Sequence, residues 1–252
     1  MLNSNSYFQY TLDELKQSSD RKLFNVVSFF AGGGGSSCGY KLAGGDILCV
    51  NEFQQVHADT YNANFPDTPV IVKDIKAVTG KLIREKIGDI DIDILDGSPP
   101  CPPFSMSGTK REGWGKEKVA YGFKQERIED LTFEHVRLVG ELQPKVVVCE
   151  NVKGLTMDYA KSHLDKMCTD FEALGYTTTY KVLNGIHFGV PQKRQRVFII
   201  SVRNDVMDDI DMPWMLISSL FPDGAMDEEP TVEDAIGDLR LDNENRVEAH
   251  EL

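Results

Sequence analysis

Seven short apolar runs, each followed by a helical segment or a polar turn, constrain the fold of this chain more than any other feature. The runs are rich in β-branched residues and bounded by glycine or polar residues, which is typical of buried strands. Strands that alternate with helices build an open α/β sheet, whose ligands bind at the carboxyl ends of the strands. The predicted strands are residues 25–30, 46–51, 70–72, 90–95, 145–149, 177–183 and 196–202. The predicted helices are residues 38–43, 54–64, 75–87, 130–142 and 160–174, with a helix-like stretch at 232–239.

The turn after the fourth strand places one cysteine among prolines, in the sequence Pro99-Pro100-Cys101-Pro102-Pro103. Proline fixes φ and removes the amide donor, so Cys101 is not absorbed into a helix or a sheet ladder. The thiol is therefore expected on a rigid turn at the sheet edge where α/β proteins place their chemistry. Taken alone, the stretch is explained equally well as a surface turn that happens to hold a cysteine.

The turn after the first strand holds four consecutive glycines, Gly32 to Gly35, which let a ligand lie close against the backbone. The second strand ends at Glu52, about twenty residues further on, the spacing at which an acid accepts hydrogen bonds from ribose hydroxyls. The strict dinucleotide pattern fails, because its third glycine would fall at Ser37 or Cys38. Glu52 therefore indicates either a nucleoside-containing cofactor or a charge at the N-terminus of the following helix.

Charged residues also lie beside two later strands. Glu150 follows the apolar fifth strand, where burial would raise its pKa and let it hold a proton near neutrality, although lone strand-end acids are more often helix caps. Lys193, Arg194 and Arg196 precede or begin the last strand and suit phosphate binding, or form an ordinary charged loop. Residues 106–125 combine glycines with an excess of positive charge, which indicates a lid over a polyanion or a solvated linker.

The composition, 41% apolar and 27% charged, is that of a soluble globular protein. No apolar segment is long enough for a membrane span and the polar start lacks a signal-peptide core, so the predicted compartment is the cytoplasm. Five widely spaced cysteines argue against a disulfide framework and a paired-cysteine zinc site, so no metal is expected. Residues 204–252 carry 15 acidic side chains against 2 arginines, which accounts for the whole net charge of -13. A nucleic-acid substrate would therefore need local basic residues or a basic partner.

The ordered motifs resemble those of the cytosine-5 DNA methyltransferases, which transfer a methyl group from S-adenosylmethionine to carbon 5 of cytosine. Each motif is weak alone, but the full series in this order and spacing is specific and covers residues 25–203. The resemblance implies an α/β, Rossmann-like S-adenosylmethionine-dependent methyltransferase sheet of about seven strands with helices on both faces, with the small recognition domain absent or only begun. The motifs are Phe30-Ala31-Gly32-Gly33-Gly34-Gly35, Asn51-Glu52, Asp74-Ile75, Pro99-Pro100-Cys101 with Phe104-Ser105, Glu150-Asn151-Val152 and Gln192-Lys193-Arg194-Gln195-Arg196.

The resemblance also implies roles. Cys101, as thiolate, would attack carbon 6 of the ring, and Glu150 would protonate or hydrogen-bond ring nitrogen 3. Arg194 and Arg196 would orient the base and a neighbouring phosphate, after the cytosine is flipped out of the duplex and the 106–125 lid closes. Substrate contacts are expected from Ser105, Asn151 and Lys193. Cofactor contacts are expected from Phe30, Ala31, Gly32, Gly34, Gly35, Glu52, Phe53, Asp74, Ile75, Ser98, Pro100 and Leu131, with Glu52 on the ribose and Asp74 and Ile75 beside the adenine.

The chain departs from the family pattern at three places. Ser28 stands where the family often has an acid, and Pro102 stands where a glutamine that helps hold the lid commonly follows the cysteine. The basic target-recognition region and a final Gly-Asn segment are missing, so the ending resembles the large subunit of split members of the family, or a truncated product. The predicted partners are double-stranded DNA and a second subunit carrying the target-recognition region. We accordingly divide the chain into an N-terminal arm (1–24), a catalytic and cofactor-binding domain (25–203) and an acidic, partner-docking segment (204–252).

Two alternatives to a DNA methyltransferase remain open from the sequence. A catalytically silent, cofactor-binding regulatory subunit explains the lost recognition region but leaves Cys101, Glu150 and Arg196 without a purpose. An RNA cytosine methyltransferase, like the tRNA-methylating branch of the family, would still carry its own recognition segment.

Overall fold

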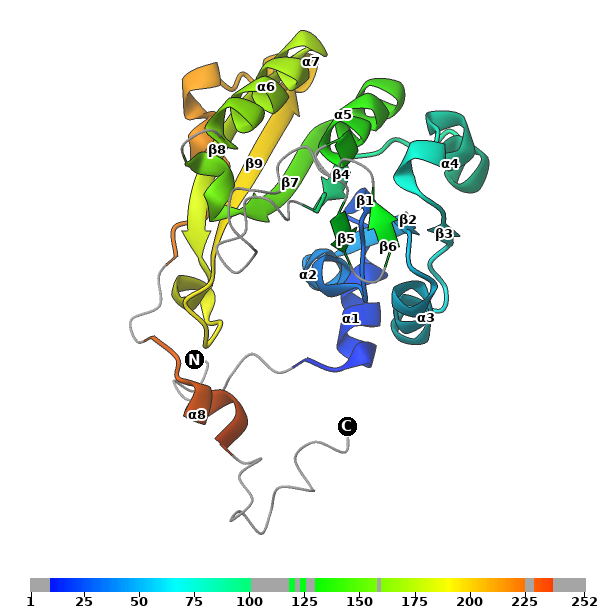
Figure 1. Cartoon of the computed structure of the whole chain (residues 1–252), viewed down its shortest axis with the longest axis vertical. Coiled ribbons are helices and arrows are strands. Elements are labelled where there is room, and N and C mark those ends of the chain that lie inside the picture. Colours follow the sequence, from blue (N-terminus) through cyan, green and yellow to red (C-terminus); the bar gives the residue numbers. More distant parts are fainter. Residues whose placement is uncertain are drawn as a thin grey trace.

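The computed structural model describes residues 10–100, 118–120, 123–125, 130–157, 160–224 and 229–237. Its centre is a sheet built from β1 (Phe24–Phe29), β2 (Gly45–Glu52), β3 (Val70–Val72), β4 (Ile94–Gly97), β7 (Val146–Val152), β8 (Tyr176–Asn184) and β9 (Gln195–Arg203). These seven strands are ordered β3-β2-β1-β4-β7-β9-β8 (Figure 1). The first five in this order are parallel, whereas β9 is antiparallel to both of its neighbours. The predicted α/β sheet is therefore confirmed.

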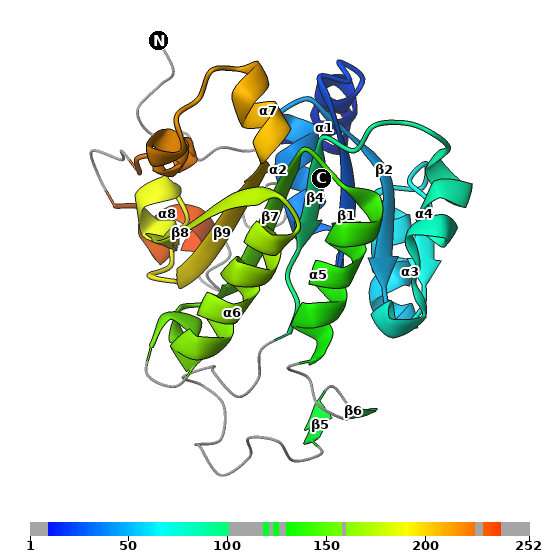
Figure 2. The same cartoon turned by 90° about the horizontal axis from the view of Figure 1, so that it is seen from above.

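Helices cover both faces of this sheet. One face is covered by α4 (Gly80–Ile87), α5 (Asp130–Leu142) and α6 (Ala160–Ala173), of which α5 and α6 lie side by side in Figure 2. The other face is covered by α1 (Leu12–Ser19), α2 (Gly35–Leu42) and α3 (Gln55–Asn64). Near β8, this second face is covered by α7 (Asn204–Asp209) and the 3-10 helix η5 (Trp214–Leu220). A short α8 (Val232–Ile236) follows.

The apolar core divides into clusters that match these two layers. In β1, Val27 and Phe29 pack with the α4, α5 and α6 side, whereas Val26 packs with Leu15 of α1 on the opposite side. This alternation is the two-residue period of a strand that is buried on both faces. Leu15 is 2% exposed, so α1 is part of this packing. None of the helices in the described ranges is long and apolar enough to cross a membrane.

The structure corrects several predicted boundaries. The predicted helix 75–87 is two elements, η1 (Ile75–Ala77) and α4, because the Thr79 side chain caps a new helix by accepting from the Leu82 amide. The predicted strand 90–95 begins only at Ile94, since Asp93 bonds the Asn25 amide through its side chain. Strand β7 continues through Val152, so that Glu150 lies within the strand and not after it. The antiparallel pair β5 (Lys118–Ala120) and β6 (Phe123–Gln125) was not predicted.

Candidate active site

Four adjacent parallel strands bring the predicted motifs to one edge of the sheet. In spatial order, β2 ends at Glu52, β1 leads into the glycine turn, β4 leads into Pro99 and Pro100, and β7 carries Glu150 near its end. Because the carboxyl ends of parallel strands meet at one edge, segments from four parts of the sequence share this edge. Cys101 and Ser105 lie outside the described residues, so their roles stay predictions.

The glycine turn is held by backbone groups and by Glu52. Phe30, Gly32 and Gly34 have φ of 57°, 54° and 98°, the left-handed region in which a bulky residue such as Phe30 is strained. The Ala31 amide donates to the Asn51 carbonyl at 3.1 Å, which ties the turn to β2. A Cβ at Gly32 or at Gly35 would meet nothing within 4 Å, so open space lies beside the turn.

Glu52 is 7% exposed and bonds this turn directly. Its Oε2 accepts from the Gly32 amide at 2.9 Å and its Oε1 from the Gln54 amide at 2.8 Å, with His57 Nδ1 at 3.6 Å from Oε1. The carboxylate thus joins the end of β2 to the glycine turn, and Phe53 beside it is 42% exposed.

The turn of Asp74 and Ile75 is fixed by a residue that the sequence analysis missed. Asp74 caps η1 by accepting from the Lys76 amide at 2.9 Å, and the Ile75 side chain is buried in the core. Arg137 of α5 donates to the carbonyls of Ile75 at 3.3 Å and Val78 at 2.7 Å. Leu131, at the start of α5, is also buried.

The turn after β4 is fixed by Asn151. The Asn151 amide is buried and donates to the Pro99 carbonyl at 3.2 Å, and its Oδ1 accepts from the Val152 amide at 2.8 Å. Asn151 therefore positions the segment that leads into Cys101, and its predicted contact with substrate stays a prediction. Ser98 and Pro100 flank Pro99 and are half-buried.

Glu150 and Arg196 form an ion pair, with 2.8 Å between Glu150 Oε1 and Arg196 Nε. Burial raises the pKa of Glu150, while Arg196 and Arg194 act in the opposite direction and the charge of Asp96 adds to the rise. The direction is the one that the sequence predicted, and it favours a carboxyl group able to donate a proton at higher pH than an exposed acid. The exposed Lys193 makes a different contact, with its Nζ 3.3 Å from Glu229 Oε2 of the acidic segment.

Two buried groups beside β4 were not anticipated. Asp96 accepts hydrogen bonds from Ser28, Ser36 and Tyr40. His135 of α5 is fully buried between the rings of Phe29 and Phe171 and packs on Gly97, where a Cβ would lie 2.5 Å from His135 Cε1. No sequence signal separates these residues from ordinary members of a strand and a helix.

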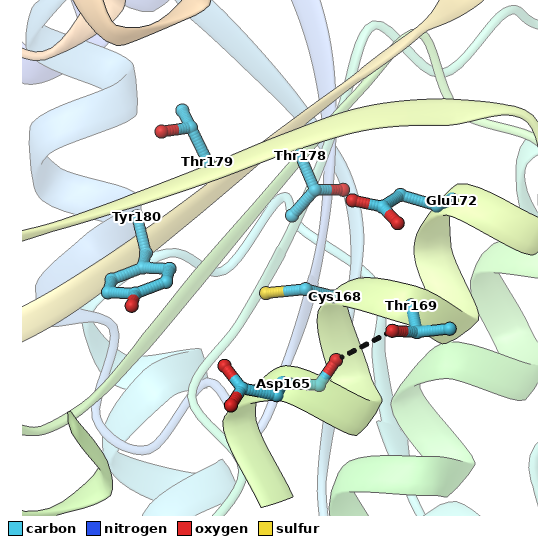
Figure 3. A pocket seen from close by; sticks show the side chains of 7 residues that line it. All are labelled: Asp165, Cys168, Thr169, Glu172, Thr178, Thr179 and Tyr180. Carbon is cyan, nitrogen blue, oxygen red and sulfur yellow. Dashed lines mark hydrogen bonds between the residues drawn. The ribbon is translucent and has the colours of Figure 1, made fainter. Parts of the chain in front are cut away.

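A surface pocket of about 580 Å³ lies elsewhere, between α6 and β8 (Figure 3). Figure 3 shows the Cys168 side chain reaching from α6 toward β8, among Asp165, Glu172 and Tyr180. Burial and the two carboxylates raise the pKa of Cys168 to about 11, which makes this thiol a poor nucleophile. Asp165 is already paired with Lys161 at 2.6 Å. None of the predicted site residues lines this pocket.

The four cysteines in the described part of the chain form no disulfide with one another, and no group of three His, Cys, Asp or Glu side chains in that part is arranged to hold a metal ion. Burial raises the pKa of Cys49 to about 12, so this core thiol is also unreactive.

Comparison with known proteins places this arrangement in a family. The model of the C-5 cytosine-specific DNA methylases matches residues 24–251. The chain is 33% identical over 217 residues to the type II methyltransferase M.XorII of Xanthomonas oryzae pv. oryzae. This match covers 84% of this chain and 46% of that protein. It is 35% identical over 188 residues to the type II methyltransferase M.AquIA of Picosynechococcus, covering 71% of each chain.

The chain is also similar to solved structures of methyltransferases. A candidate DNA modification methyltransferase encoded within a prophage (E. coli) has a TM-score of 0.65 at 26% identity, covering 84% of this chain and 54% of that one. A Spodoptera frugiperda DNMT2 variant, at 20% identity and a TM-score of 0.54, shares the fold. The chain spans about half the length of the first curated relatives, 46% of M.XorII and 51% of M1.HphI. From the family match over residues 24–251, this chain belongs to the C-5 cytosine-specific DNA methylases.

Proposed function

We propose that this chain is the catalytic portion of a DNA (cytosine-5)-methyltransferase, with residues 25–203 as its catalytic and cofactor-binding domain. The reaction transfers a methyl group from S-adenosylmethionine to carbon 5 of a cytosine flipped out of double-stranded DNA. The observation that carries the proposal is the sheet edge shared by β2, β1, β4 and β7, since these adjacent strands carry Glu52, the glycine turn, the Pro99 turn and Glu150 respectively.

The residues at this edge fit S-adenosylmethionine. Open space beside Gly32 and Gly35 leaves room for a ligand against the backbone, and Glu52 ends β2 with an acceptor for ribose hydroxyls. Asp74 and Ile75 would flank the adenine, on a turn held by Arg137. When bound, the cofactor supplies a methyl group that its positively charged sulfur activates for transfer.

The chain's own residues prepare the cytosine for this transfer. The Cys101 thiolate forms a bond to carbon 6, and the ring electrons shift so that carbon 5 becomes nucleophilic. Glu150 donates a proton or hydrogen bond to ring nitrogen 3, which disperses the charge that the attack creates. Once carbon 5 carries the methyl group, a solvent water takes its proton, the electrons of that bond restore the double bond between carbons 5 and 6, and the bond to sulfur breaks to release the thiolate. Glu150 takes back any proton that it gave to nitrogen 3. Arg196, paired with Glu150, would orient both the carboxyl group and the base.

The test uses duplex DNA and S-adenosylmethionine with a labelled methyl group. We expect label in DNA, and a stable covalent complex with duplexes that carry 5-fluorocytosine, because fluorine at carbon 5 blocks the proton loss that frees the enzyme. Cys101→Ala should abolish both results while keeping cofactor affinity. Methylation by this variant would exclude the covalent route. Transfer to RNA alone, or cofactor binding without transfer to any nucleic acid, would favour the two alternative functions.

We further propose that residues 204–252 dock a basic partner that carries the target-recognition region. Between Asn204 and Gly224 there are five aspartates and no lysine or arginine. Within the same stretch Trp214 is 71% and Met215 63% exposed, so exposed apolar side chains lie in a segment whose charged residues are all acidic. A basic recognition subunit should bind in a salt-dependent manner and lose affinity with Trp214→Ala, whereas Trp214→Phe should retain most of it. An affinity for the partner that depends neither on salt nor on Trp214 would contradict this docking surface.

A further inference from the structure

Asp96 is a buried carboxyl group whose hydrogen-bond partners within the described residues include no basic side chain. It is 5% exposed, and its Oδ2 accepts from Ser28 Oγ at 2.8 Å and Ser36 Oγ at 2.9 Å. Its Oδ1 accepts from the Tyr40 hydroxyl at 3.2 Å. All three of these partners are neutral hydroxyls. Burial raises the pKa of Asp96, whereas the three hydrogen bonds act in the opposite direction and favour the ionised form without neutralising its charge.

This charge lies between the two turns of the candidate active site. Ser28 is the register partner of Asp96 across β1 and β4, and it precedes Phe30 by two residues. Ser36 stands in the first turn of α2, directly after the glycines. On the other side, Asp96 is three residues before Pro99 in the segment that leads to Cys101. The hydroxyls therefore fix the Asp96 carboxyl group beside the glycine turn, on the strand that leads into the Pro99 turn.

The field of Asp96 also reaches the reaction site. The pKa of Glu150 is raised first by burial, and Asp96 contributes a further rise through its charge. The strand register gives the geometry, because Asp96 on β4 is opposite Val148 on β7, two residues before Glu150, so Asp96 and Glu150 lie on the same face of the sheet. A cation bound between the glycine turn and the Pro99 turn would be stabilised by the negative charge of Asp96.

The proposed methyl donor is such a cation, because its sulfonium carries a positive charge that the thioether product lacks. We propose that Asp96 makes this site select the sulfonium donor over its neutral thioether product, with Ser28, Ser36 and Tyr40 holding the carboxylate in place. This inference rests on the proposed function, and it assigns Asp96 a specificity-determining role.

The experiment measures, by calorimetry on the full chain, the affinities for S-adenosylmethionine and for S-adenosylhomocysteine. Asp96→Asn keeps the shape and removes the charge, so the ratio of the two affinities should shift toward the product by about tenfold. A donor analogue that carries a protonated amine in place of the sulfonium should also bind the Asp96→Asn variant more weakly than it binds the unaltered chain. Asp93→Asn is the matched control, since Asp93 lies in the segment that leads into the same strand but is paired with Lys145 at 2.8 Å. This control should leave the ratio unchanged.

A second variant separates charge from packing. The double change Ser28→Asp with Asp96→Asn moves the carboxylate across one register pair and should restore much of the ratio. Because both ligands are measured on each sample, the ratio does not depend on the fraction of folded protein. An equal loss for both ligands, or no change in the ratio, would overturn the role of Asp96 while leaving the proposed function standing. Failure of the unaltered chain to bind either ligand would overturn both.

Discussion

Arg196 reaches from β9 to Glu150 on β7, and its Nε lies 2.8 Å from Glu150 Oε1. The two strands are antiparallel neighbours, with Val152 opposite Arg196 in the register. The antiparallel course of β9 therefore lets the loop before that strand deliver cations to a carboxyl group at the end of a parallel strand. Glu150 is thus under two opposing influences, since burial favours its protonated form and the arginines favour its ionised form.

This balance predicts the pH dependence of methyl transfer. If Glu150 acts as a proton donor, turnover should fall as pH rises through its pKa. Arg194 lowers that pKa, so Arg194→Gln should raise it and move the descending limb of the pH profile to higher pH. Lys193→Gln removes one charge from the same loop and is the control, with an unmoved limb. Identical profiles for all three proteins would show that Glu150 does not set the rate.

The Asn151 side chain predicts a link between β7 and the catalytic turn. Asn151→Ala leaves the buried Pro99 carbonyl without its donor, which should cost about 1–3 kcal/mol of unfolding free energy. We also expect at least about a tenfold loss of kcat, because the segment before Cys101 is no longer positioned. Asn64→Ala is the comparison, since Asn64 donates to the Gly33 carbonyl from an exposed position. Urea unfolding measures the loss of stability, and single-turnover rates measure the loss of activity. Unchanged values for Asn151→Ala would show that other contacts hold the Pro99 turn.

Glu52 predicts a loss of cofactor binding. Glu52→Gln keeps the shape but turns one acceptor into a donor that faces the Gly32 or Gln54 amide. With its ribose contact also impaired, affinity for S-adenosylmethionine should fall by about 1–3 kcal/mol, measured by calorimetry. Glu85→Gln, which alters an exposed helix pair with Lys81, should bind as the unaltered chain does. Full affinity in the Glu52 variant would mean that the cofactor lies elsewhere.

The sheet was predictable because its signals are local. Short β-branched runs, a glycine turn after the first and acids at the ends of the second and fifth are each readable within a few residues. The direction of β9 was not readable, since an apolar run looks the same in either direction. The division of helix 75–87 carried a signal, the Thr79-Gly80 pair, which matches a cap at the start of α4.

The supporting contacts of the site were not predictable, because they join segments far apart in sequence. Ser28 meets Asp96 across 68 positions, and Arg137 reaches the Ile75 carbonyl across 62. Each is an ordinary residue within its own element, and only the strand register and the helix packing bring the partners together. Motifs thus predict which residues would contact a ligand, whereas the residues that hold those motifs in place emerge only from the tertiary structure.

His135 predicts acid lability of the fold. Neither ring nitrogen has a hydrogen-bond partner in the described residues, and burial lowers the pKa of His135 to about 4. A histidine in the unfolded chain has a pKa of about 6.5. The neutral ring therefore stabilises the fold fully above that pH, and this contribution is lost as the pH falls toward about 4. The loss amounts to about 3 kcal/mol. His135→Leu should flatten the pH dependence of the unfolding free energy, measured by urea titrations between these pH values. His57→Gln, at a half-buried histidine, should retain this dependence.

The contact between Gly97 and His135 predicts strain that a second change relieves. A Cβ at Gly97 would lie 2.5 Å from His135 Cε1 and 2.7 Å from Nδ1, so Gly97→Ala must displace the ring or the strand. Overpacking of this kind costs about 1–3 kcal/mol, and displacement of β4 should also slow turnover, because this strand leads into Pro99. Removing the ring with His135→Ala should make Gly97→Ala far less costly, so the double variant should be more stable than the sum of the two changes implies. Gly39→Ala, at a helical glycine whose Cβ would meet nothing within 4 Å, should be neutral or stabilising. Additive losses in the Gly97 and His135 pair would show that the two residues do not press on each other.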